Sequence, residues 1–587
     1  MRGLLARGEY RSDAASRETA ASLFLRERIL AARGLTDPGT LAAYLDPKLT
    51  HLHDPSLIPD LDRAAERILR ACHDGEQIVI YGDYDVDGVT GTAILWHMVR
   101  AISPQANVRT YVPHRLEEGY GLNESAVREL AGDGAKLLVS VDCGITAIAP
   151  VQIASSLGLA VIITDHHNPP TRLDDLPGAF AVVHPRRPDS QYPFKDLSGA
   201  GVAYKLAWRL ATMHAGGRHT SPELRGLLVD LLAFASLGTI ADIVPLHGEN
   251  RVLARHGLVR CRHSRFVGLN ALVEASGLAG EDIDAMAVGF RLGPRLNAAG
   301  RMGHAREANE LFTTTDADRA KIIAAQLSKQ NRERQEAEQR ILDQADEMAV
   351  KLGMTGADGH RAIVLVHRDW HAGVVGIVCS RLVERHHRPV ILLCLSDDSA
   401  HGSGRSIEGF NLHGALADCS HLLDKFGGHD MAAGLRVSAA NLPAFIESFL
   451  AIAAGTIEPE RLCKRLRIDC DATVDELTVS SVKELEALQP CGAGNPTPIV
   501  RVQGAVVADR PMPMGSEGRH IAVLVQSTES QRPVRAVGWG FGQHRERFVP
   551  GQRLDLVVKP RISTWQGASR VEPELVDFAL SVSPEPE

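Results

Sequence analysis

The sequence predicts an α/β protein made of a parallel-sheet domain, a long connecting helix, a second and smaller α/β domain and a C-terminal β-barrel. Apolar runs typical of strands alternate with helical patterns between about residues 75 and 185, which indicates βαβ units around a parallel sheet. No Gly or Pro interrupts the chain from Thr315 to Leu352, which favours one continuous helix. Short apolar runs separated by Gly-rich turns after about residue 467 are typical of a small barrel. A chain of 587 residues has room for these domains.

The same patterns, followed in chain order, divide the chain into five segments. The boundaries that we expect are 1–55 for a charged, helical N-terminal segment, 56–314 for the parallel-sheet domain, 315–353 for the connecting helix, 354–460 for the smaller α/β domain, and 461–587 for the barrel with a C-terminal tail. The smaller α/β domain is expected because two apolar runs, 362–366 and 389–393, begin a new strand pattern after the helix.

The connecting helix carries a start signal and an unusually polar middle. Thr315 followed by Asp318 resembles a capping box, so we expect the helix to begin there. Residues 328–340 are polar on almost every face, whereas Ile341 and Met348 belong to an apolar stripe at helical spacing. A helix that is polar all round often bridges two domains through solvent, and we expect this one to do so.

Composition favours a cytoplasmic protein. Nine cysteines are scattered without a C-x-x-C pair, which predicts neither a disulfide framework nor a zinc knuckle and favours a reducing compartment. The N-terminus lacks a long apolar segment, and the longest apolar stretch, 227–241, is interrupted by Asp230 and too short to span a bilayer. The formal net charge of −8 argues weakly against nucleic-acid binding, but it averages over all domains.

Two segments are basic although the whole chain is acidic. Residues 501–570 hold eleven Lys or Arg against five acids, a net charge of +6, and residues 291–306 hold four Arg and no acid. Either segment can be an ordinary solvated surface or a surface that meets phosphate. Three aromatic residues of the first segment are candidates for stacking on bases, although a place in the barrel core is equally open for each: Trp539, Phe541 and Trp565.

The most informative motif is a set of three carboxylates close behind an apolar run. The run 78–80 leads into Asp-Tyr-Asp-Val-Asp-Gly, which places carboxylates at positions 83, 85 and 87. This spacing matches the opening of an EF-hand calcium loop, but the twelfth position, which needs a bidentate Glu, is Ile94, and the flank is strand-like. The remaining interpretation is a divalent metal site at the carboxyl edge of an α/β sheet.

Three more acidic motifs end elements of the same domain. Asp142 ends one strand, Asp-His-His at 165–167 ends another, and Asp242 ends an apolar segment, whereas His184 and Cys143 are expected to be ordinary packed residues. Each acid alone is more often a turn or capping residue, but four such motifs in one domain favour a metal site. Oxygen ligands with imidazole and no thiolate suit Mn²⁺ or Mg²⁺ better than zinc. Because crowded carboxylates repel one another, we expect two cations, and phosphoester hydrolysis is the chemistry of such a pair.

These motifs resemble the four motifs of the DHH phosphoesterase superfamily, which are Asp-Tyr-Asp-Val-Asp-Gly at 83–88, Val-Asp-Cys-Gly-Ile at 141–145, Asp-His-His at 165–167 and Gly-Thr-Ile-Ala-Asp-Ile-Val-Pro-Leu at 238–246. Gly-Gly-His-Asp-Met-Ala-Ala-Gly at 427–434 is similar to the signature of the associated second domain, DHHA1. Pro-Cys-Gly-Ala-Gly-Asn-Pro-Thr-Pro at 490–498 and the basic strand region resemble the OB-fold domain of the superfamily's single-strand-specific exonucleases, although Cys491 stands where Phe is usual. The resemblance covers nearly the whole chain and implies a DHH domain, a DHHA1 domain and an OB-fold β-barrel.

The resemblance also implies roles for individual residues. Metal ligation is implied for Asp83, Asp85, Asp87, Asp142, His166 and Asp242. Catalytic roles are implied for Asp142, His166 and His167, with His167 beside the phosphate or just behind the ligands. Contacts with substrate phosphate are implied for Arg115, Arg301, His304, Ser403, Arg405 and His429. The segments 402–406 and 427–429 read as Gly-rich loops with free backbone amides, which are about as often ordinary turns as phosphate sites.

The function that the resemblance implies is a metal-dependent 5′→3′ exonuclease that hydrolyses single-stranded DNA to mononucleotides in DNA repair and recombination, with two Mn²⁺ or Mg²⁺ ions. It implies single-stranded DNA, a helicase and a single-strand-binding protein as partners. Composition predicts no membrane association, and we expect a monomer. A phosphoesterase for small molecules or short oligonucleotides is the first alternative, but it needs no basic barrel. A catalytically inactive replication scaffold is the second, but such relatives lose their acids, and all four acidic motifs are intact here.

Overall fold

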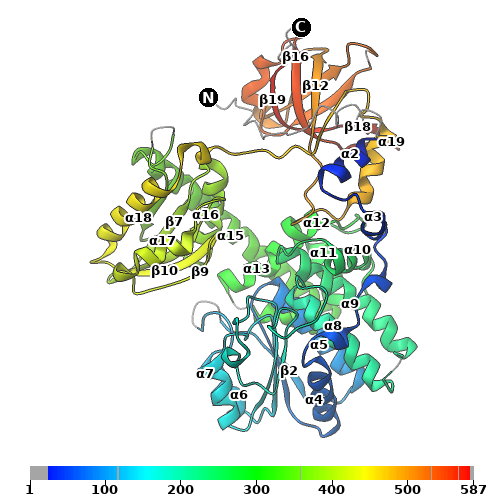
Figure 1. Cartoon of the computed structure of the whole chain (residues 1–587), viewed down its shortest axis with the longest axis vertical. Coiled ribbons are helices and arrows are strands. Elements are labelled where there is room, and N and C mark those ends of the chain that lie inside the picture. The colour runs from blue at the N-terminus through cyan, green and yellow to red at the C-terminus, as the bar shows by residue number, and fades with distance from the viewer. Residues whose placement is uncertain are drawn as a thin grey trace. The chain divides into compact units, whose positions relative to one another are not determined.

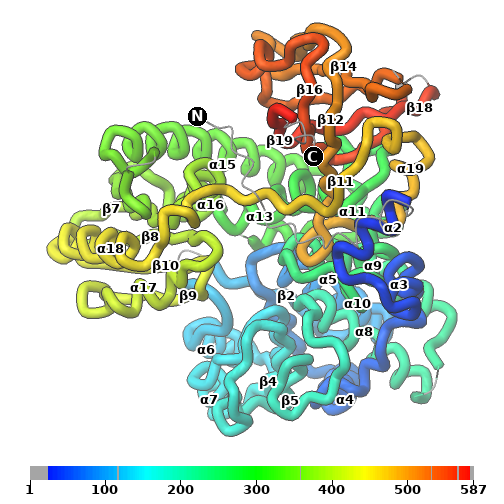
Figure 2. Tube along the Cα trace, turned by 45° about the horizontal axis from the view of Figure 1, so that its top comes forward, coloured from blue at the N-terminus to red at the C-terminus, as the bar shows by residue number. Residues whose placement is uncertain are grey.

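The computed structural model of the chain describes residues 24–114, 118–217, 219–303, 305–356, 359–530, 532–565 and 567–581. These residues form two compact units (Figures 1 and 2). One unit is Leu52–Cys463, and it holds both α/β domains and the connecting helix. The other joins the described part of Met1–His51 to the described part of Lys464–Glu587.

The first α/β domain is built on a five-stranded, all-parallel sheet of order β2-β1-β3-β4-β5. Its strands are β1 (Ile78–Gly82), β2 (Val108–Tyr111), β3 (Leu137–Val141), β4 (Ala160–Thr164) and β5 (Ala181–Val183). Parallel sheets are covered on both faces, so successive side chains of β1 enter two different cores. Ile78 and Ile80 pack in the larger core, and Val79 and Tyr81 pack in the smaller one.

Helices cover both faces of this sheet (Figure 1). The larger core includes α4 (Leu61–His73), α5 (Val86–Ile102), α8 (Gly199–His214) and α9 (Pro222–Ala241). The smaller core includes α6 (Glu124–Gly132) and α7 (Ile148–Ser156). The apolar stretch 227–241 was expected to be too short for a membrane span, but it is part of α9, which has 20 residues and could cross a membrane by length and composition. However, 67% of its most apolar window is buried inside the domain, so we interpret α9 as a core helix.

A group of helices leads from the sheet to the connecting helix: α10 (Gly248–Arg262), α11 (Val267–Ala275), α12 (Ala285–Ala287), the π-helical turn Val288–Leu292, α13 (Gly293–Met302) and α14 (Arg306–Thr313). The connecting helix, α15 (Ala317–Lys351), is continuous, as predicted. Its N-cap is Asp316 rather than Thr315, because the Asp316 carboxylate accepts hydrogen bonds from the backbone N–H groups of Asp318 and Arg319 at 2.9 and 3.1 Å.

The polar middle of α15 is not solvated on every side, contrary to the prediction. Asn331, Arg334 and Glu338 are buried, because α15 packs against α11, α13 and α16 (Ala372–His386). Glu338 accepts hydrogen bonds from Arg334 at 2.7 Å and from Arg381 of α16 at 3.1 Å. The buried charged side chains of α15 are therefore paired with charges of opposite sign. The sequence pattern does not reveal this pairing.

The second α/β domain has a five-stranded sheet of order β6-β7-β8-β10-β9, in which β6 and β7 are parallel and the other pairs antiparallel. Its elements are β6 (Ile363–His367), β7 (Val390–Leu395), β8 (Ser399–Arg405), β9 (Lys425–His429) and β10 (Ala432–Ser438), with α16, α17 (Leu412–Asp418) and α18 (Leu442–Thr456). The prediction of Gly-rich loops at 402–406 and 427–429 is wrong, because these segments lie in β8 and β9 apart from Ser406. The backbone of β8 pairs with β7 and β10, so its amides are not free.

The second unit contains the predicted barrel. Five strands close in the order β12-β16-β19-β15-β14 through an additional pairing of β12 with β14. The elements of this unit are β11 (Cys470–Ala472), α19 (Val479–Glu484), β12 (Val500–Val507), β13 (Met512–Met514), β14 (His520–Gln526), β15 (Val534–Gly538), β16 (Arg553–Lys559), β17 (Ile562–Trp565), β18 (Ala568–Val571) and β19 (Glu574–Leu580). Phe541 packs against the barrel core, whereas Trp539 is 54% exposed. The side chain of Trp565 lies outside the described part of the chain.

The described N-terminal helices, α2 (Leu25–Ala32) and α3 (Pro38–Leu45), belong to the barrel unit. Leu25 and Tyr44 are buried in the same hydrophobic cluster as the barrel strands. Arg33 binds both carboxylate oxygens of Asp469, 436 positions later, at 2.9 and 3.0 Å. Two distant stretches of the chain therefore share one core.

Candidate metal centre

The carboxyl edge of the parallel sheet gathers polar side chains from three neighbouring strands. Asp83 directly follows β1, Asp142 follows β3, and Asp165 follows β4. In the order β2-β1-β3-β4-β5 the winding of the chain reverses between β1 and β3, and open sheets bind ligands beyond the strand ends at such a point. The fold thus places these side chains where a site is expected.

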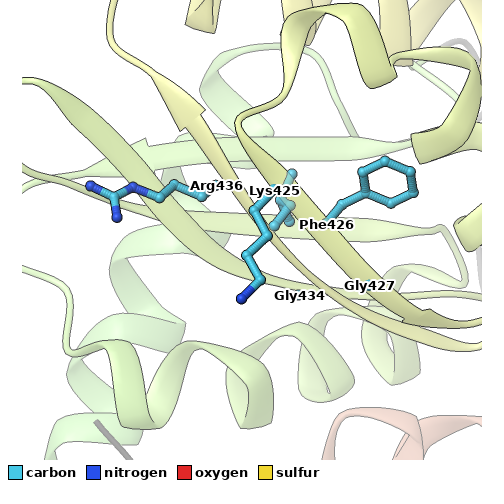
Figure 3. Close-up of a pocket in the computed structure, with 6 residues that line it drawn as sticks. Lys425, Phe426, Gly427, Gly434 and Arg436 are labelled. Carbon is cyan, nitrogen blue, oxygen red and sulfur yellow. The ribbon is translucent and has the colours of Figure 1, made fainter. Parts of the chain in front are cut away.

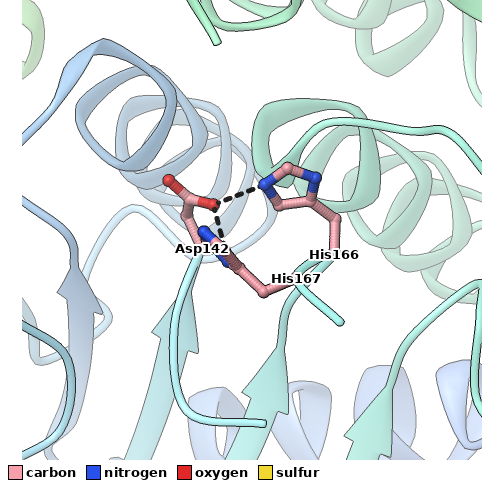
Figure 4. A group of neighbouring side chains, drawn as sticks. All are labelled: Asp142, His166 and His167. Carbon is pink, nitrogen blue, oxygen red and sulfur yellow. Dashed lines mark ion pairs between the residues drawn. The ribbon is translucent and has the colours of Figure 1, made fainter. Parts of the chain in front are cut away.

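Seven polar residues meet at this edge, and they are the residues with predicted metal or catalytic roles. Their ligand atoms form three overlapping groups, each within 4.8 Å: Asp83, Asp85 and Asp142; Asp87, His166 and Asp242; and Asp142, His166 and His167. Oδ1 of Asp142 lies 3.1 Å from Nε2 of His166 and 3.8 Å from Nδ1 of His167. Figure 4 shows this one oxygen facing both histidine rings.

Helix ends fix three of the carboxylates. Asp85 caps the N-terminus of α5, where its Oδ1 accepts a hydrogen bond from the backbone N–H of Asp87 at 2.9 Å. The Asp87 side chain in turn accepts from the N–H groups of Gly199 and Ala200, at 2.5 and 2.9 Å, at the start of α8. Asp242 is the C-cap residue of α9. Tertiary packing therefore brings these side chains together from separate parts of the domain.

Glycines allow this close packing. A Cβ on Gly199 would lie 2.6 Å from Cβ of Asp142, and a Cβ on Gly238 would lie 2.3 Å from Oδ1 of Asp87. Both distances are too short for real contacts, so α8 and α9 can approach the carboxylates only with Gly at these positions. Asp142 itself has a left-handed φ of 63°, a conformation that Asp tolerates better than most residues.

Burial and mutual repulsion raise the pKa values of the carboxyl groups. Asp142 is 1% exposed, and burial followed by the charges of the neighbouring carboxylates raises its pKa well above the usual range. Burial and then the charge of Asp85 raise the pKa of Asp87 to about 7. Burial and then the charge of Asp87 raise the pKa of Asp242 to about 9. A divalent cation would stabilise the ionised forms of this group.

The donor atoms of the centre suit a cation that prefers oxygen and imidazole ligands. Oδ1 of Asp142 and both ring nitrogens of His166 are buried, and none makes a hydrogen bond to a described residue. Burial and then the charge of His167 lower the pKa of His166 to about 3, so its ring is neutral and can ligate a metal. Cys143 packs in the smaller hydrophobic core, as predicted, and stays out of the three groups. Carboxylates with a neutral imidazole fit Mn²⁺ or Mg²⁺.

Asp165, for which the sequence predicts no separate role, orients the two histidines. Its Oδ1 accepts hydrogen bonds from the backbone N–H groups of His166 and His167, at 2.7 and 3.1 Å, and from Nδ1 of His167 at 2.8 Å. Burial acts to raise the pKa of Asp165, but the hydrogen bonds and charge of His167 hold it below its ordinary value. Burial acts to lower the pKa of His167, but its hydrogen bond with Asp165 raises it. The pair therefore favours a protonated His167.

Three further side chains hold the histidines in place. The Tyr120 hydroxyl lies 3.2 Å from the ring of His167. His184, predicted to be a satisfied polar residue, donates from Nε2 to the backbone oxygen of His167 at 2.7 Å. Arg186 donates to the backbone oxygen of His166. Tyr120 and Arg186 belong to no recognised motif, so only the folded geometry identifies them.

Three residues predicted to contact phosphate belong to the first domain. Arg115 and His304 lie outside the described residues. Arg301, on α13, donates from its guanidinium to the backbone oxygen of Gly373, which lies at the start of α16, at 2.9 Å. The structure therefore places Arg301 where the connecting region meets the second α/β domain.

The other three predicted phosphate contacts lie in the second α/β domain. Ser403 and Arg405 project from β8 toward α16, where a Cβ on Gly376 would lie 3.3 Å from Oγ of Ser403 and 3.4 Å from Nη2 of Arg405. Arg405 has no acidic partner among the described residues, and its guanidinium donates to the backbone oxygen of Gly404 at 2.8 Å. His429, at the end of β9, is exposed. The fold thus brings Ser403 and Arg405 together and leaves their side chains available to a ligand.

Three family models match the chain in sequence order. The model of the DHH family, N-terminal domain matches residues 77–235, that of the DHHA1 domain matches residues 359–455, and that of the RecJ OB domain matches residues 468–577. The parallel-sheet domain, the second α/β domain and the barrel are therefore DHH, DHHA1 and OB domains.

Relatives match over most of the chain. The single-stranded-DNA-specific exonuclease RecJ of Bacillus subtilis (strain 168) is 39% identical, over 94% of this chain and 67% of that protein. The protein of the same description from Escherichia coli (strain K12) is 34% identical, over 86% of each chain. The crystal structure of RecJ in complex with Mn²⁺ from Thermus thermophilus matches with a TM-score of 0.77 at 32% identity, covering 95% of this chain and 76% of that one. The chain therefore belongs to the RecJ family.

Proposed function

We propose that this protein is a metal-dependent exonuclease that hydrolyses single-stranded DNA from its 5′ end and releases mononucleotides in DNA repair and recombination. The observation that carries the proposal is the group of seven carboxylate and imidazole side chains at the carboxyl edge of the DHH sheet. Membership of the RecJ family supports it, because the curated relatives are named single-stranded-DNA-specific exonucleases. The completeness of the group argues against an inactive scaffold.

Two Mn²⁺ or Mg²⁺ ions would be held by six side chains, which are those of Asp83, Asp85, Asp87, Asp142, His166 and Asp242. When bound, such a pair lowers the pKa of a water and stabilises the charge that develops on the phosphate. Asp142 belongs to two of the three groups, so its carboxylate can join two ion positions. The structures of RecJ from Thermus thermophilus in complex with Mn²⁺ and with Mg²⁺ support this choice of metals.

His167 has the features of a hydrogen-bond donor to the substrate phosphate. Asp165 binds its Nδ1 and favours the protonated ring, whose Nε2–H group lies 3.2 Å from the Tyr120 hydroxyl and can share its hydrogen bond with a phosphate oxygen. The Tyr120 hydroxyl, 3.2 Å from the ring, restricts its rotation. His167 would therefore offer a positive charge beside the carboxylates, where charge develops on the phosphate.

The DHHA1 domain would hold the 5′ end of the strand. Arg405 can bind a phosphate through its two-pronged guanidinium, and the Ser403 hydroxyl and the His429 ring can add hydrogen bonds. The remaining proposed phosphate contacts are those of Arg115, Arg301 and His304. Together they would position the first phosphodiester bond on the metals.

The OB domain would bind the single strand. Its segment 501–570 carries a net charge of +6, and the exposed ring of Trp539 lies against His520, so phosphate attraction and base stacking are both available. Phe541 packs against the barrel core and is not proposed as a stacking residue. We further propose that the protein acts as a monomer, together with a helicase and a single-strand-binding protein.

The test is digestion of single strands labelled at either end, with a 5′ phosphate or a 5′ hydroxyl, in Mn²⁺, Mg²⁺ or EDTA. We expect early release of labelled mononucleotide from 5′-labelled strands only, and no release in EDTA. Duplex DNA of the same sequence is the control and should remain intact. Early release of the 3′ label would refute the polarity, and turnover of dinucleotides alone would favour a small-molecule phosphoesterase.

A further inference from the structure

One face of the DHHA1 sheet carries basic side chains on either side of small residues. The strand register places three cross-strand rows on this face: His401, Arg436 and Lys425; Ser403, Gly434 and Gly427; and Arg405, Ala432 and His429. Paired residues of antiparallel strands point to the same side of a sheet. The opposite face, which includes Leu435 and Phe426, packs into the core of the domain.

A pocket of about 330 Å³ lies on the edge strand β9 and its neighbour β10. Figure 3 shows Lys425 and Arg436 extending beside Gly427 and Gly434, whereas Phe426 points away from them. These four residues are exposed, and we call the depression that they line the trough. The trough is therefore basic and open to solvent.

The two glycines of the trough are not required by the fold. Gly428 is required, because it has a φ of 137° and a Cβ there would lie 2.3 Å from the backbone oxygen of Ala432. In contrast, a Cβ on Gly427 would have no atom within 4 Å, and one on Gly434 would lie 3.8 Å from the backbone oxygen of Gly402. Gly weakens a strand, and open space above it often marks a place where a ligand approaches closely.

The three basic side chains of the first row, His401, Arg436 and Lys425, lack acidic partners among the described residues. Lys425 and His401 make no hydrogen bond or ion pair with a described residue. Within the described chain, Arg436 donates only to the hydroxyl of Ser399, at 3.2 Å. Elsewhere in this domain exposed cations are paired, as for Arg385, which lies 2.6 Å from a carboxylate of α15. Three basic side chains that have no acidic partner among the described residues, on an open face, favour an anionic ligand.

We propose that the row of His401, Arg436 and Lys425 binds a phosphate group of single-stranded DNA, and that the strand lies across the two glycines of the trough. This inference rests on the proposed function and adds a second phosphate contact to the one at Arg405. The two rows are four residues apart along β8 and β10, about 14 Å at a rise of about 3.4 Å per residue. They can therefore hold different phosphates of one strand, with the glycines beneath the nucleotides between them.

The test measures equilibrium binding of the full-length protein to 5′-phosphorylated single strands in EDTA, over a range of salt concentrations. For the double variant Lys425→Gln, Arg436→Gln we expect Kd to rise roughly tenfold. The slope of log Kd against log salt should become shallower by about 0.7 for each phosphate that the variant no longer neutralises. Lys351→Gln removes one exposed charge at the end of α15 and is the control, which should change neither quantity.

A glycine series separates a ligand site from a structural role. Gly434→Ala adds a Cβ that the fold accepts, and Gly434→Val extends it into the trough. Because β-branched residues favour strands, the Val variant should melt at an unchanged or higher temperature, yet it should bind single strands more weakly than the Ala variant.

Two outcomes decide the inference separately from the proposed function. If the Gln variants and Gly434→Val bind with the Kd and salt slope of the wild type, the strand does not cross the trough and the inference is wrong. Cleavage of single strands by the wild type is measured in parallel. Its absence would overturn the proposed function, while the binding data would still decide whether the trough holds a strand.

Discussion

Replacing Asp142 by Asn should stabilise the metal-free protein and abolish hydrolysis. Asp142 is buried and belongs to two of the three groups of the metal centre. Burial and the neighbouring carboxylates raise its pKa, which shows that its charge is disfavoured. Asn has nearly the same shape and tolerates the left-handed φ of 63°. The substitution therefore removes a buried charge without disturbing the backbone.

The size of the effect follows from the distances in the centre. The ligand atoms of Asp142 and two neighbours, Asp83 and Asp85, lie within 4.8 Å of one another. At that distance and an effective dielectric constant of about 20, one ionised neighbour repels the Asp142 carboxylate by about 3 kcal/mol. In the metal-free wild type, protonation of the carboxyl groups already relieves most of this repulsion. We therefore expect Asp142→Asn to raise the free energy of unfolding by only about 1–2 kcal/mol. The melting temperature should rise by roughly 2–6 °C.

The assay combines thermal unfolding in EDTA and in Mn²⁺ with calorimetric Mn²⁺ binding and turnover of single strands. Mn²⁺ should stabilise the wild type but add little to Asp142→Asn. Asp142→Ala is the backbone control, and its free energy of unfolding should be lower than that of the Asn variant by about 1–2 kcal/mol, because Ala resists the left-handed conformation. A lower metal-free melting temperature for Asp142→Asn, or wild-type Mn²⁺ affinity, would refute the reasoning.

Three other predictions concern pH, the 5′ phosphate and the barrel unit. The pKa values of Asp87 and Asp242, about 7 and about 9, exceed the usual carboxyl value, so the folded metal-free protein binds more protons than the unfolded chain. Its stability should therefore fall as pH rises from about 4 to about 9, and Mn²⁺ should reverse this trend in melting curves; stability that rises with pH in EDTA would contradict the shifts. Arg405→Lys should raise KM more than Lys351→Gln does, and Arg405→Ala should lower kcat/KM on 5′-phosphorylated strands roughly tenfold or more. An equal loss on 5′-hydroxyl strands would argue against a contact with the terminal phosphate. A fragment of residues 52–463, which lacks the barrel unit, should still cleave short oligonucleotides. It should bind long single strands more weakly than the full chain does, and log Kd should depend less steeply on log salt. Unchanged binding would show that the fragment itself binds long strands.

The parallel sheet and its carboxyl edge could be predicted because short local patterns specify them. Asp142 and His166 follow buried apolar runs almost directly, and the ends of parallel strands lie at one edge. The approach of Asp242 could not be derived in this way, because it comes from the end of α9. Gly238 permits that approach, and only the packing of α9 shows why a side chain is excluded there.

Features that depend on tertiary neighbours were missed or misread. Glycine is depleted in strands, so the Gly-rich segments 402–406 and 427–429 read as loops until the pairing of β8 and β9 with β10 is known. Asp165 and Arg186 act through backbone groups of the histidine pair. Asp165 belongs to the recognised Asp-His-His motif, but the motif does not show that its carboxylate accepts hydrogen bonds from the two histidines. No motif contains Arg186. Helix α15 begins one residue later than the sequence predicts, because its N-cap is Asp316 and not Thr315.

The core shared by the N-terminal helices and the barrel constrains the order in which the chain folds during synthesis. Arg33 leaves the ribosome 436 positions before Asp469, its partner. Until the barrel is made, Leu25 and Ile29 lack the strand residues that complete their hydrophobic cluster, and only apolar residues of the N-terminal segment, such as Leu30, are present. Contacts of such large sequence separation form slowly, whereas the DHH domain is contiguous and can fold while synthesis continues. Chains released before residue 464 should therefore expose an apolar N-terminal segment, need chaperones to avoid aggregation, and be cut there first by added protease.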